Sequence, residues 1–132
     1  MSLRLMLDTD SVSYAIRGRG HVGARIVERK PSELCISAIT LAELRYGVER
    51  RKSRKLEAAV SAFVANLAVV PFDDACAVTF GRIAAKLAEA GAPIGESDTL
   101  IAAHALTLGL TLVTNNERHF KRVAGLKIVS WV

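Results

Sequence analysis

Short apolar runs alternate along the chain with longer stretches in which apolar residues recur at helical spacing. The short runs, which have the length of strands, lie at 3–7, 34–37, 68–71, 111–114 and 127–130. Helical spacing is found at 11–17, 22–29, 41–51, 54–67, 74–90 and 98–108. The short runs are almost continuously apolar, which is typical of strands that are buried on both faces.

Strands that are separated by helices predict parallel pairing, because consecutive parallel strands need a crossover connection. The sequence therefore predicts an α/β fold in which helices cover both faces of a mainly parallel sheet. In such folds, the carboxyl ends of the strands and the starts of the following helices share one edge, where ligands bind. Polar residues at that edge are the candidates for a functional site.

The length of 132 residues fits one domain, and the composition is that of a globular protein, so we expect a single domain over residues 1–132. Hydrophobic residues make up 51% of the chain and charged residues 23%, and the formal net charge is +5. This charge permits an anionic partner without establishing one. Cys35 and Cys76 lie in apolar segments without the spacing of a zinc site, so we expect them to be core residues. The sequence shows no signal peptide and no membrane-spanning segment, which predicts a cytoplasmic protein.

Acidic residues occur where the predicted sheet edge should be. Asp8 and Asp10 follow the first apolar run, Glu43 lies in the helix after the second, and Asp98 begins a strongly apolar helix. Carboxylates that converge at a partly buried edge repel one another and stay ionised only around a cation. Oxygen ligands suit Mg²⁺ or Mn²⁺. We therefore predict that Asp8 and Asp98 bind a divalent cation directly, and that Glu43 completes the site or acts as a base on the attacking water.

Neutral residues beside these acids are candidates for orienting them. Thr9 adjoins Asp8, and Thr114 and Asn116 follow the fourth run. Their side chains could supply the hydrogen bonds that aim carboxylates toward a metal. His104 falls within a predicted helix and is expected to be a helix residue rather than a ligand.

Each acid also has a purely structural interpretation. Thr40 and Glu43 match a capping box, in which the threonine caps a helix and the glutamate bonds back to its backbone. Asp8 or Asp10 could cap the first helix, and Asp98 could complement the dipole of its own helix.

A basic cluster follows Glu43 and includes Arg45, Arg50 and Arg51. Such a cluster could neutralise phosphates beside an acidic pocket, as a metal-dependent nuclease requires. The alternative is a solvated helix end.

Four segments, in the same order and at similar spacing, resemble PIN-domain ribonucleases, in particular the VapC toxins of bacterial toxin–antitoxin pairs. They are Met-Leu-Asp-Thr-Asp at 6–10, Ser-x-x-Thr-x-x-Glu-Leu-x-x-Gly at 37–47, Gly-x-x-Asp-x-x-Ile-Ala-Ala-His-Ala at 95–105, and Val-Thr-Asn-Asn at 113–116 with Phe120 behind. The resemblance covers essentially the whole chain.

The resemblance implies a three-layer α/β/α PIN-like domain and a Mg²⁺- or Mn²⁺-dependent endoribonuclease, in which metal-activated water hydrolyses RNA phosphodiesters. Its acids correspond to Asp8, Glu43 and Asp98. It also implies a homodimer that a VapB-type antitoxin inhibits in a hetero-oligomer. This chain departs from the family because Asn116 stands where many PIN domains have a fourth acid. Glu96 is a candidate to compensate.

Two other function classes are left open. The segment around Asp8 also resembles the Asp-x-Asp loop of a phosphatase, in which the first aspartate is a nucleophile, although the chain lacks a suitably placed later lysine. The protein could instead be a non-catalytic basic module that binds RNA or protein, with its acids serving only as helix caps.

Overall fold

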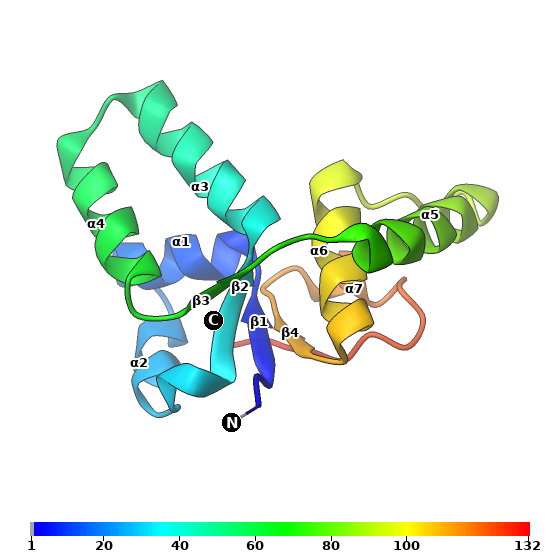
Figure 1. The fold of residues 1–132 in the computed structure, drawn as a ribbon, viewed down its shortest axis with the longest axis horizontal. Coiled ribbons are helices and arrows are strands. Elements are labelled where there is room, and N and C mark those ends of the chain that lie inside the picture. The colour runs from blue at the N-terminus through cyan, green and yellow to red at the C-terminus, as the bar shows by residue number, and fades with distance from the viewer. Residues whose placement is uncertain (1) are drawn as a thin grey trace.

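Five strands form one sheet in the computed structural model, which describes residues 2–132 (Figure 1). They are β1 (Leu5–Leu7), β2 (Leu34–Ser37), β3 (Ala68–Val70), β4 (Thr111–Val113) and β5 (Ile128–Val129). Their order is β3-β2-β1-β4-β5, and all neighbouring strands are parallel. The predicted parallel sheet is confirmed, although four of its strands are one or two residues shorter than expected.

Helices cover both faces of the sheet, as predicted. They are α1 (Thr9–Arg17), α2 (Val22–Val27), α3 (Ala38–Arg51), α4 (Arg54–Val64), α5 (Asp74–Glu89), α6 (Glu96–Leu108) and α7 (Glu117–Phe120), with a 3₁₀ turn at Pro31–Glu33. Figure 1 shows α1 to α4 on one side of the sheet and α5 and α6 on the other. Side chains of β1 alternate between these layers: Leu5 and Leu7 join the core under α1 to α4, and Met6 joins the core under α5 and α6.

The start of α3 differs from the expected one. Ser37 caps this helix, because its side chain accepts a hydrogen bond from the backbone N–H of Ile39 at 3.0 Å. Thr40 is therefore inside the helix and buried, and the capping-box interpretation of Thr40 and Glu43 is wrong. The helix begins three residues earlier than predicted, which places Glu43 in its second turn.

Helix α6 is buried around much of its circumference. It begins at Glu96, two residues before the predicted start, and residues 101–105 are all buried. His104 is one of them, so the prediction that it lies within a helix is confirmed, and its side chain is packed in the core. Its Nδ1 lies 2.7 Å from the hydroxyl oxygen of Ser37, and its ring meets that of Phe72 edge-on, with centroids 5.5 Å apart.

The two cysteines are buried free thiols, as expected of core residues. Burial raises the pKa of Cys35 to about 12. Across residues 2–132, no helix combines the length and the apolarity needed to cross a membrane.

Strand order places a crevice at the centre of the sheet. From β1 the chain builds outward to β2 and β3 on one side, and then to β4 and β5 on the other. The carboxyl ends of β1 and β4 therefore flank the point where the winding reverses, which is the usual ligand site of an open parallel sheet. Asp8 and Thr114 are the first residues after these two strands.

Candidate active site

Asp8 lies at the crevice and has a structural role there as well. Its carboxylate Oδ1 accepts a hydrogen bond from the backbone N–H of Ser11 at 2.8 Å, so it caps α1. The residue is only 3% exposed. Burial raises the pKa of Asp8, against the hydrogen bonds from Thr114 and Ser11, and the nearby charge of Asp10 raises it further. The capping and functional interpretations of Asp8 are therefore compatible.

Glu43 points from α3 toward the start of α1. The hydroxyl of Thr9 donates a hydrogen bond to Glu43 Oε1 at 2.5 Å, and the Thr9 oxygen lies 3.2 Å from the Thr40 hydroxyl. Thr9 has a single hydroxyl proton, so Thr40 donates to Thr9 while Thr9 donates to the carboxylate. This chain of hydroxyls fixes the direction of the Glu43 side chain.

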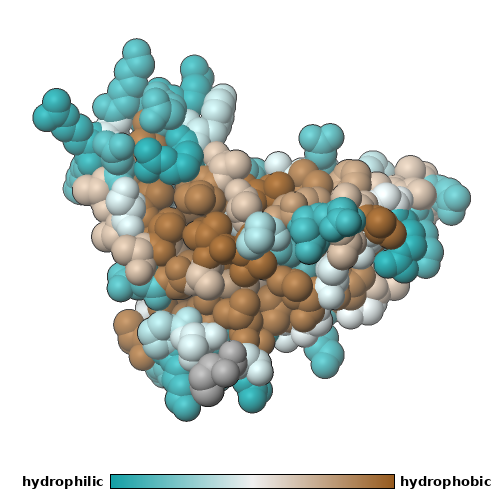
Figure 2. Space-filling model, in the orientation of Figure 1, coloured by the Kyte–Doolittle hydropathy of each residue, from teal (hydrophilic) through white to brown (hydrophobic). Residues whose placement is uncertain are grey.

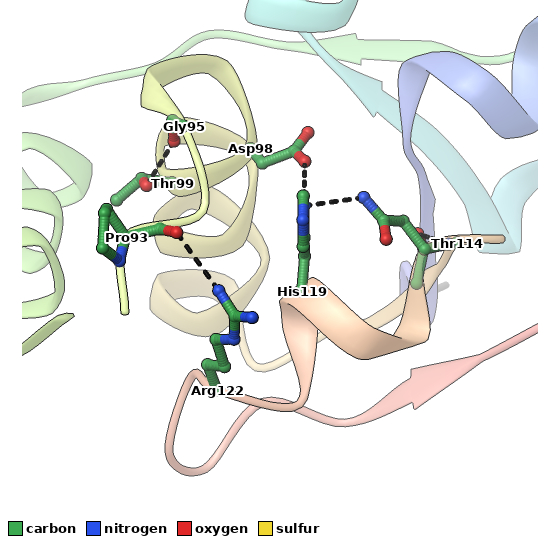
Figure 3. Close-up of polar contacts among 8 residues, drawn as sticks. Pro93, Gly95, Asp98, Thr99, Thr114, His119 and Arg122 are labelled. Carbon is green, nitrogen blue, oxygen red and sulfur yellow. Dashed lines mark hydrogen bonds and ion pairs between the residues drawn. The ribbon is translucent and has the colours of Figure 1, made fainter. Parts of the chain in front are cut away.

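Asp98 faces His119, which comes from α7 (Figure 3). The Nδ1 atom of His119 lies 3.5 Å from Asp98 Oδ2 and 2.8 Å from the side-chain nitrogen of Asn116. The backbone N–H of Asn116 donates to the hydroxyl of Thr114 at 2.9 Å. Asn116 thus links the end of β4 to His119, which in turn contacts the carboxylate at the start of α6.

The charges of Asp10 and Glu43 affect the pKa values of the other two acids, Asp8 and Asp98. Burial is the largest effect on the pKa of Asp98 and raises it. The hydrogen bond and charge of His119 lower this pKa, and the charges of Asp10 and Glu43 raise it further. Asp10 acts on Asp8 in the same direction. Acids from three separate segments therefore lie near enough to the crevice for their charges to act on Asp98. Within residues 2–132, however, no three His, Cys, Asp or Glu side chains lie close enough to enclose a metal ion.

The other predicted site residues lie farther from this centre. Glu96 is exposed, and it forms no hydrogen bond or ion pair within the described part of the chain. Arg45 pairs with Glu57 at 3.4 Å. Arg50 and Arg51 are exposed in the last turn of α3, where hydrophilic side chains gather at the tip of the α3–α4 hairpin (Figure 2). Of the three arginines, only Arg51 lines a hollow that also contains Glu43.

The contribution of α1 to the site was not predicted from the sequence. Arg17 lines the same hollow as Glu43, and it also lines a second hollow together with Asp10. Ser13 and Arg17 follow Asp10 by three and seven residues, so helical spacing alone places them on one face. That spacing was the signal available in the sequence.

Comparisons with known proteins agree over almost the full length of the chain. A family model described as PIN domain matches residues 5–126. The tRNA(fMet)-specific endonuclease VapC of Salmonella typhimurium is 40% identical, over 98% of this chain and 98% of the relative. Ribonuclease VapC2 of Haemophilus influenzae is also 40% identical, over 98% of this chain and 99% of the relative.

Solved structures show the same similarity. DNA-bound VapBC from Salmonella typhimurium matches with a TM-score of 0.89 and 40% identity, over 99% of this chain and 100% of the other. VapBC2 from Rickettsia felis, bound to a DNA fragment from its promoter, matches with a TM-score of 0.88 and 33% identity, over 98% and 100%.

Proposed function

The chain belongs to the PIN-domain family, and we propose that it is a metal-dependent endoribonuclease, the toxin of a type II (VapBC) toxin–antitoxin pair. The observation that carries this proposal is that Asp98, at the start of α6, lies near enough to Asp10 and Glu43 for their charges to raise its pKa. Identity of 40% to VapC relatives along nearly the whole chain supports the same activity.

The crevice suits a hard divalent cation, Mg²⁺ or Mn²⁺. The raised pKa values of Asp8 and Asp98 reflect carboxylates that are buried and crowded by like charge, a condition that a cation relieves. Mg²⁺ needs only one or two carboxylates and keeps several waters, so a closed cage of three acids is unnecessary. In this proposal Asp8 and Asp98 bind the cation directly and Glu43 completes the site. Such an ion supplies positive charge to a phosphoryl oxygen and lowers the pKa of a water molecule.

The protein's own residues orient the reaction. Thr9 holds one oxygen of Glu43, so the other oxygen can accept a proton from the attacking water. His119 contacts the Asp98 carboxylate, Asn116 contacts His119, and Thr114 forms a hydrogen bond with Asp8. Asn116 would therefore act through His119 and the Asp98 carboxylate, without adding a fourth negative charge.

The proposed partners are RNA, as substrate, and a VapB-type antitoxin. The similar structures from Salmonella typhimurium and Rickettsia felis are VapBC complexes, which supports an antitoxin partner for this chain. The homodimer that the resemblance implies stays a prediction. Two relatives are named as tRNA(fMet)-specific endonucleases, so initiator tRNA is the first substrate to test.

The test is cleavage by purified protein that has been freed of any antitoxin. Total RNA and initiator tRNA are incubated with Mg²⁺, with Mn²⁺ or with EDTA, and the new ends are mapped. We expect cation-dependent cuts with 5′-phosphate and 3′-hydroxyl ends, and none from Asp98→Asn. Asp74→Asn, which changes an exposed acid on α5, is the control and should cleave normally. RNA binding without any cleavage would favour the non-catalytic module instead.

A further inference from the structure

A hollow of about 120 Å³ lies beside Glu43, between α1 on one side and α3 and α4 on the other. Thr9 and Glu43 line it where it adjoins the acidic crevice. Its apolar lining is formed by Ile16, Leu44, Leu56 and Val60. Arg17 and Arg51 add two guanidinium groups. The hollow therefore combines an apolar surface with positive charge, next to the proposed catalytic acids.

Gly47 lines this hollow from the middle of α3. Glycine destabilises the interior of a helix relative to alanine, so a glycine at such a position calls for a reason. Packing within the protein does not supply one, because a Cβ atom built at Gly47 meets no atom within 4 Å. The absent side chain instead leaves space in the hollow.

A second hollow, of about 230 Å³, continues from the first. The two share Ser13 and Arg17, and the second also contains Asp10, Tyr14, Arg19 and Asn115. One hollow thus includes Glu43 and the other Asp10, which both act on Asp98. Arg17 borders both spaces beside the crevice.

The arginines of these hollows are available to an anion. Among residues 2–132, the ion pairs of arginine side chains involve Arg4, Arg25 and Arg45, and not Arg17, Arg19 or Arg51. A ligand that suits this surface carries negative charge at intervals and flat apolar groups between. A nucleic acid strand has both features, because bases pack on apolar and aromatic side chains while phosphates bind arginine.

Resting on the function proposed above, we propose that the hollow lined by Gly47 binds the nucleotide next to the scissile phosphate of the RNA. The base lies against the apolar lining, and the flanking phosphates bind Arg17 and Arg51. The strand then continues past Arg17 into the hollow of Tyr14 and Arg19. This surface positions the RNA relative to the acids, and the acids carry out the hydrolysis.

Filling the hollow is the direct test. Gly47→Leu places a side chain in it, and Gly81→Leu is the matched control, because Gly81 is an exposed glycine inside α5 whose Cβ also meets nothing within 4 Å. Affinity for labelled initiator tRNA is measured in EDTA, which prevents metal-dependent cleavage. We expect Gly47→Leu to weaken binding about tenfold or more, the effect of losing one base contact, and Gly81→Leu to leave it unchanged. The Tm of neither variant should fall.

Charge removal gives a second measurement. Arg17→Ala and Arg51→Ala should each reduce the slope of log Kd against log salt concentration by about 0.7, the value for one phosphate contact on a single strand. Lys86→Ala removes the same charge from the exposed surface of α5 and should leave the slope unchanged.

The outcomes separate this inference from the proposed function. If wild-type protein cleaves RNA and folded Gly47→Leu binds and cleaves it equally well, the nucleotide site is wrong while the nuclease stands. Unchanged RNA affinity together with lost binding of an antitoxin chain would overturn the proposal too, by assigning the hollow to the protein partner. If wild-type protein neither binds nor cleaves RNA, the proposed function itself fails.

Discussion

Ser37 and His104 join the first turn of α3 to the middle of α6 through a buried contact of 2.7 Å between Oγ and Nδ1. The Ser37 hydroxyl also accepts from the N–H of Ile39, so it hydrogen-bonds both to the backbone of α3 and to the ring of His104, whose second ring nitrogen is Nε2. That Nε2 is buried without a hydrogen-bond partner among the described residues. Since Glu43 lies on α3 and Asp98 on α6, this contact links the two helices that carry the proposed catalytic acids.

The stability of the protein should fall at acid pH because His104 is buried. Burial lowers the pKa of His104, so as pH falls below the ordinary value of 6.5 the unfolded chain takes up the proton before the folded protein does. The native state therefore loses stability on acidification and not at neutral pH. His104→Leu removes this titration, and at pH 7.5 it costs about 1 kcal/mol through the lost hydrogen bond. We expect the Tm difference between wild type and variant to shrink from pH 7.5 to pH 5.5; a constant difference would contradict the prediction.

Asp8→Asn should stabilise the metal-free protein and abolish its activity. The raised pKa of Asp8 means that the carboxylate ionises more readily in the unfolded chain, so its charge costs the folded state stability above the ordinary pKa of 3.8. Asparagine caps a helix about as well as aspartate and carries no charge. We expect a higher Tm in EDTA at pH 7, an advantage that shrinks toward pH 4, and a loss of cleavage of at least roughly a hundredfold.

Asp73→Asn is the matched control for Asp8. Asp73 also caps a helix, α5, by accepting from the backbone N–H of Cys76, but it is exposed. The hydrogen bond from Cys76 lowers the pKa of Asp73, so neutralising this residue should not raise the Tm at pH 7. An equal rise in Tm for Asp8→Asn and Asp73→Asn would contradict the prediction, because it would show that burial at the crevice does not destabilise the charged form of Asp8.

Mn²⁺ should stabilise the wild-type protein, because it binds the folded state and relieves the crowding of its carboxylates. The shift in Tm should rise with Mn²⁺ concentration, reverse with EDTA, and disappear in Asp98→Asn. Asp74→Asn should keep the full shift. A shift that survives in Asp98→Asn would place the cation elsewhere on the protein.

Thr9 should increase the rate of cleavage by orienting the Glu43 carboxylate. Thr9→Val keeps the shape of the side chain and removes the hydroxyl that donates to the carboxylate. We expect kcat to fall roughly 10- to 100-fold, as for other residues that orient a metal-site carboxylate, with little change in KM. Thr9→Ser restores the hydroxyl and should restore kcat. A variant that lost activity only by unfolding would show a fall in Tm instead.

Arg45 should contribute little to RNA binding, contrary to the sequence-based expectation. Its guanidinium pairs with Glu57 at the surface, where such a pair contributes at most about 1 kcal/mol to stability. Arg45→Ala should leave the affinity for initiator tRNA nearly unchanged, whereas Arg51→Ala should weaken it. A larger loss from Arg45→Ala would place the strand along the α3–α4 hairpin instead.

Strand positions were predictable because apolar runs of strand length are a local signal, and α/β alternation then dictated the parallel sheet. The helix cap at Ser37 was missed because the residue also completes an apolar run, so the pattern placed it in the strand alone. Thr40 was predicted to be a cap because Thr-x-x-Glu is a local capping pattern. The actual partner of its hydroxyl, Thr9, is 31 residues away in the sequence and could not be seen locally. Helix α7, which spans Glu117–Phe120, is too short to give a periodic signal.

The acids were visible in the sequence because they follow strand ends, and so were Thr9 and Thr114 beside them, but the contact between Asp98 and His119 was not. The approach of His119 to Asp98 depends on how α7 packs beside α6, which no local pattern encodes. The same is true of Arg17 and Arg51, which line one hollow only because α1 packs beside α3.

The central position of β1 has a consequence for biosynthesis. Leu5 pairs with Leu34 on one side and with Thr111 on the other. One edge of β1 therefore has no partner strand until residues 111–113 have been translated. Long-range parallel pairing is slow and has to wait for the later strand to leave the ribosome. A nascent chain of this protein therefore cannot assemble the crevice beside Asp8 until β4 has been synthesised.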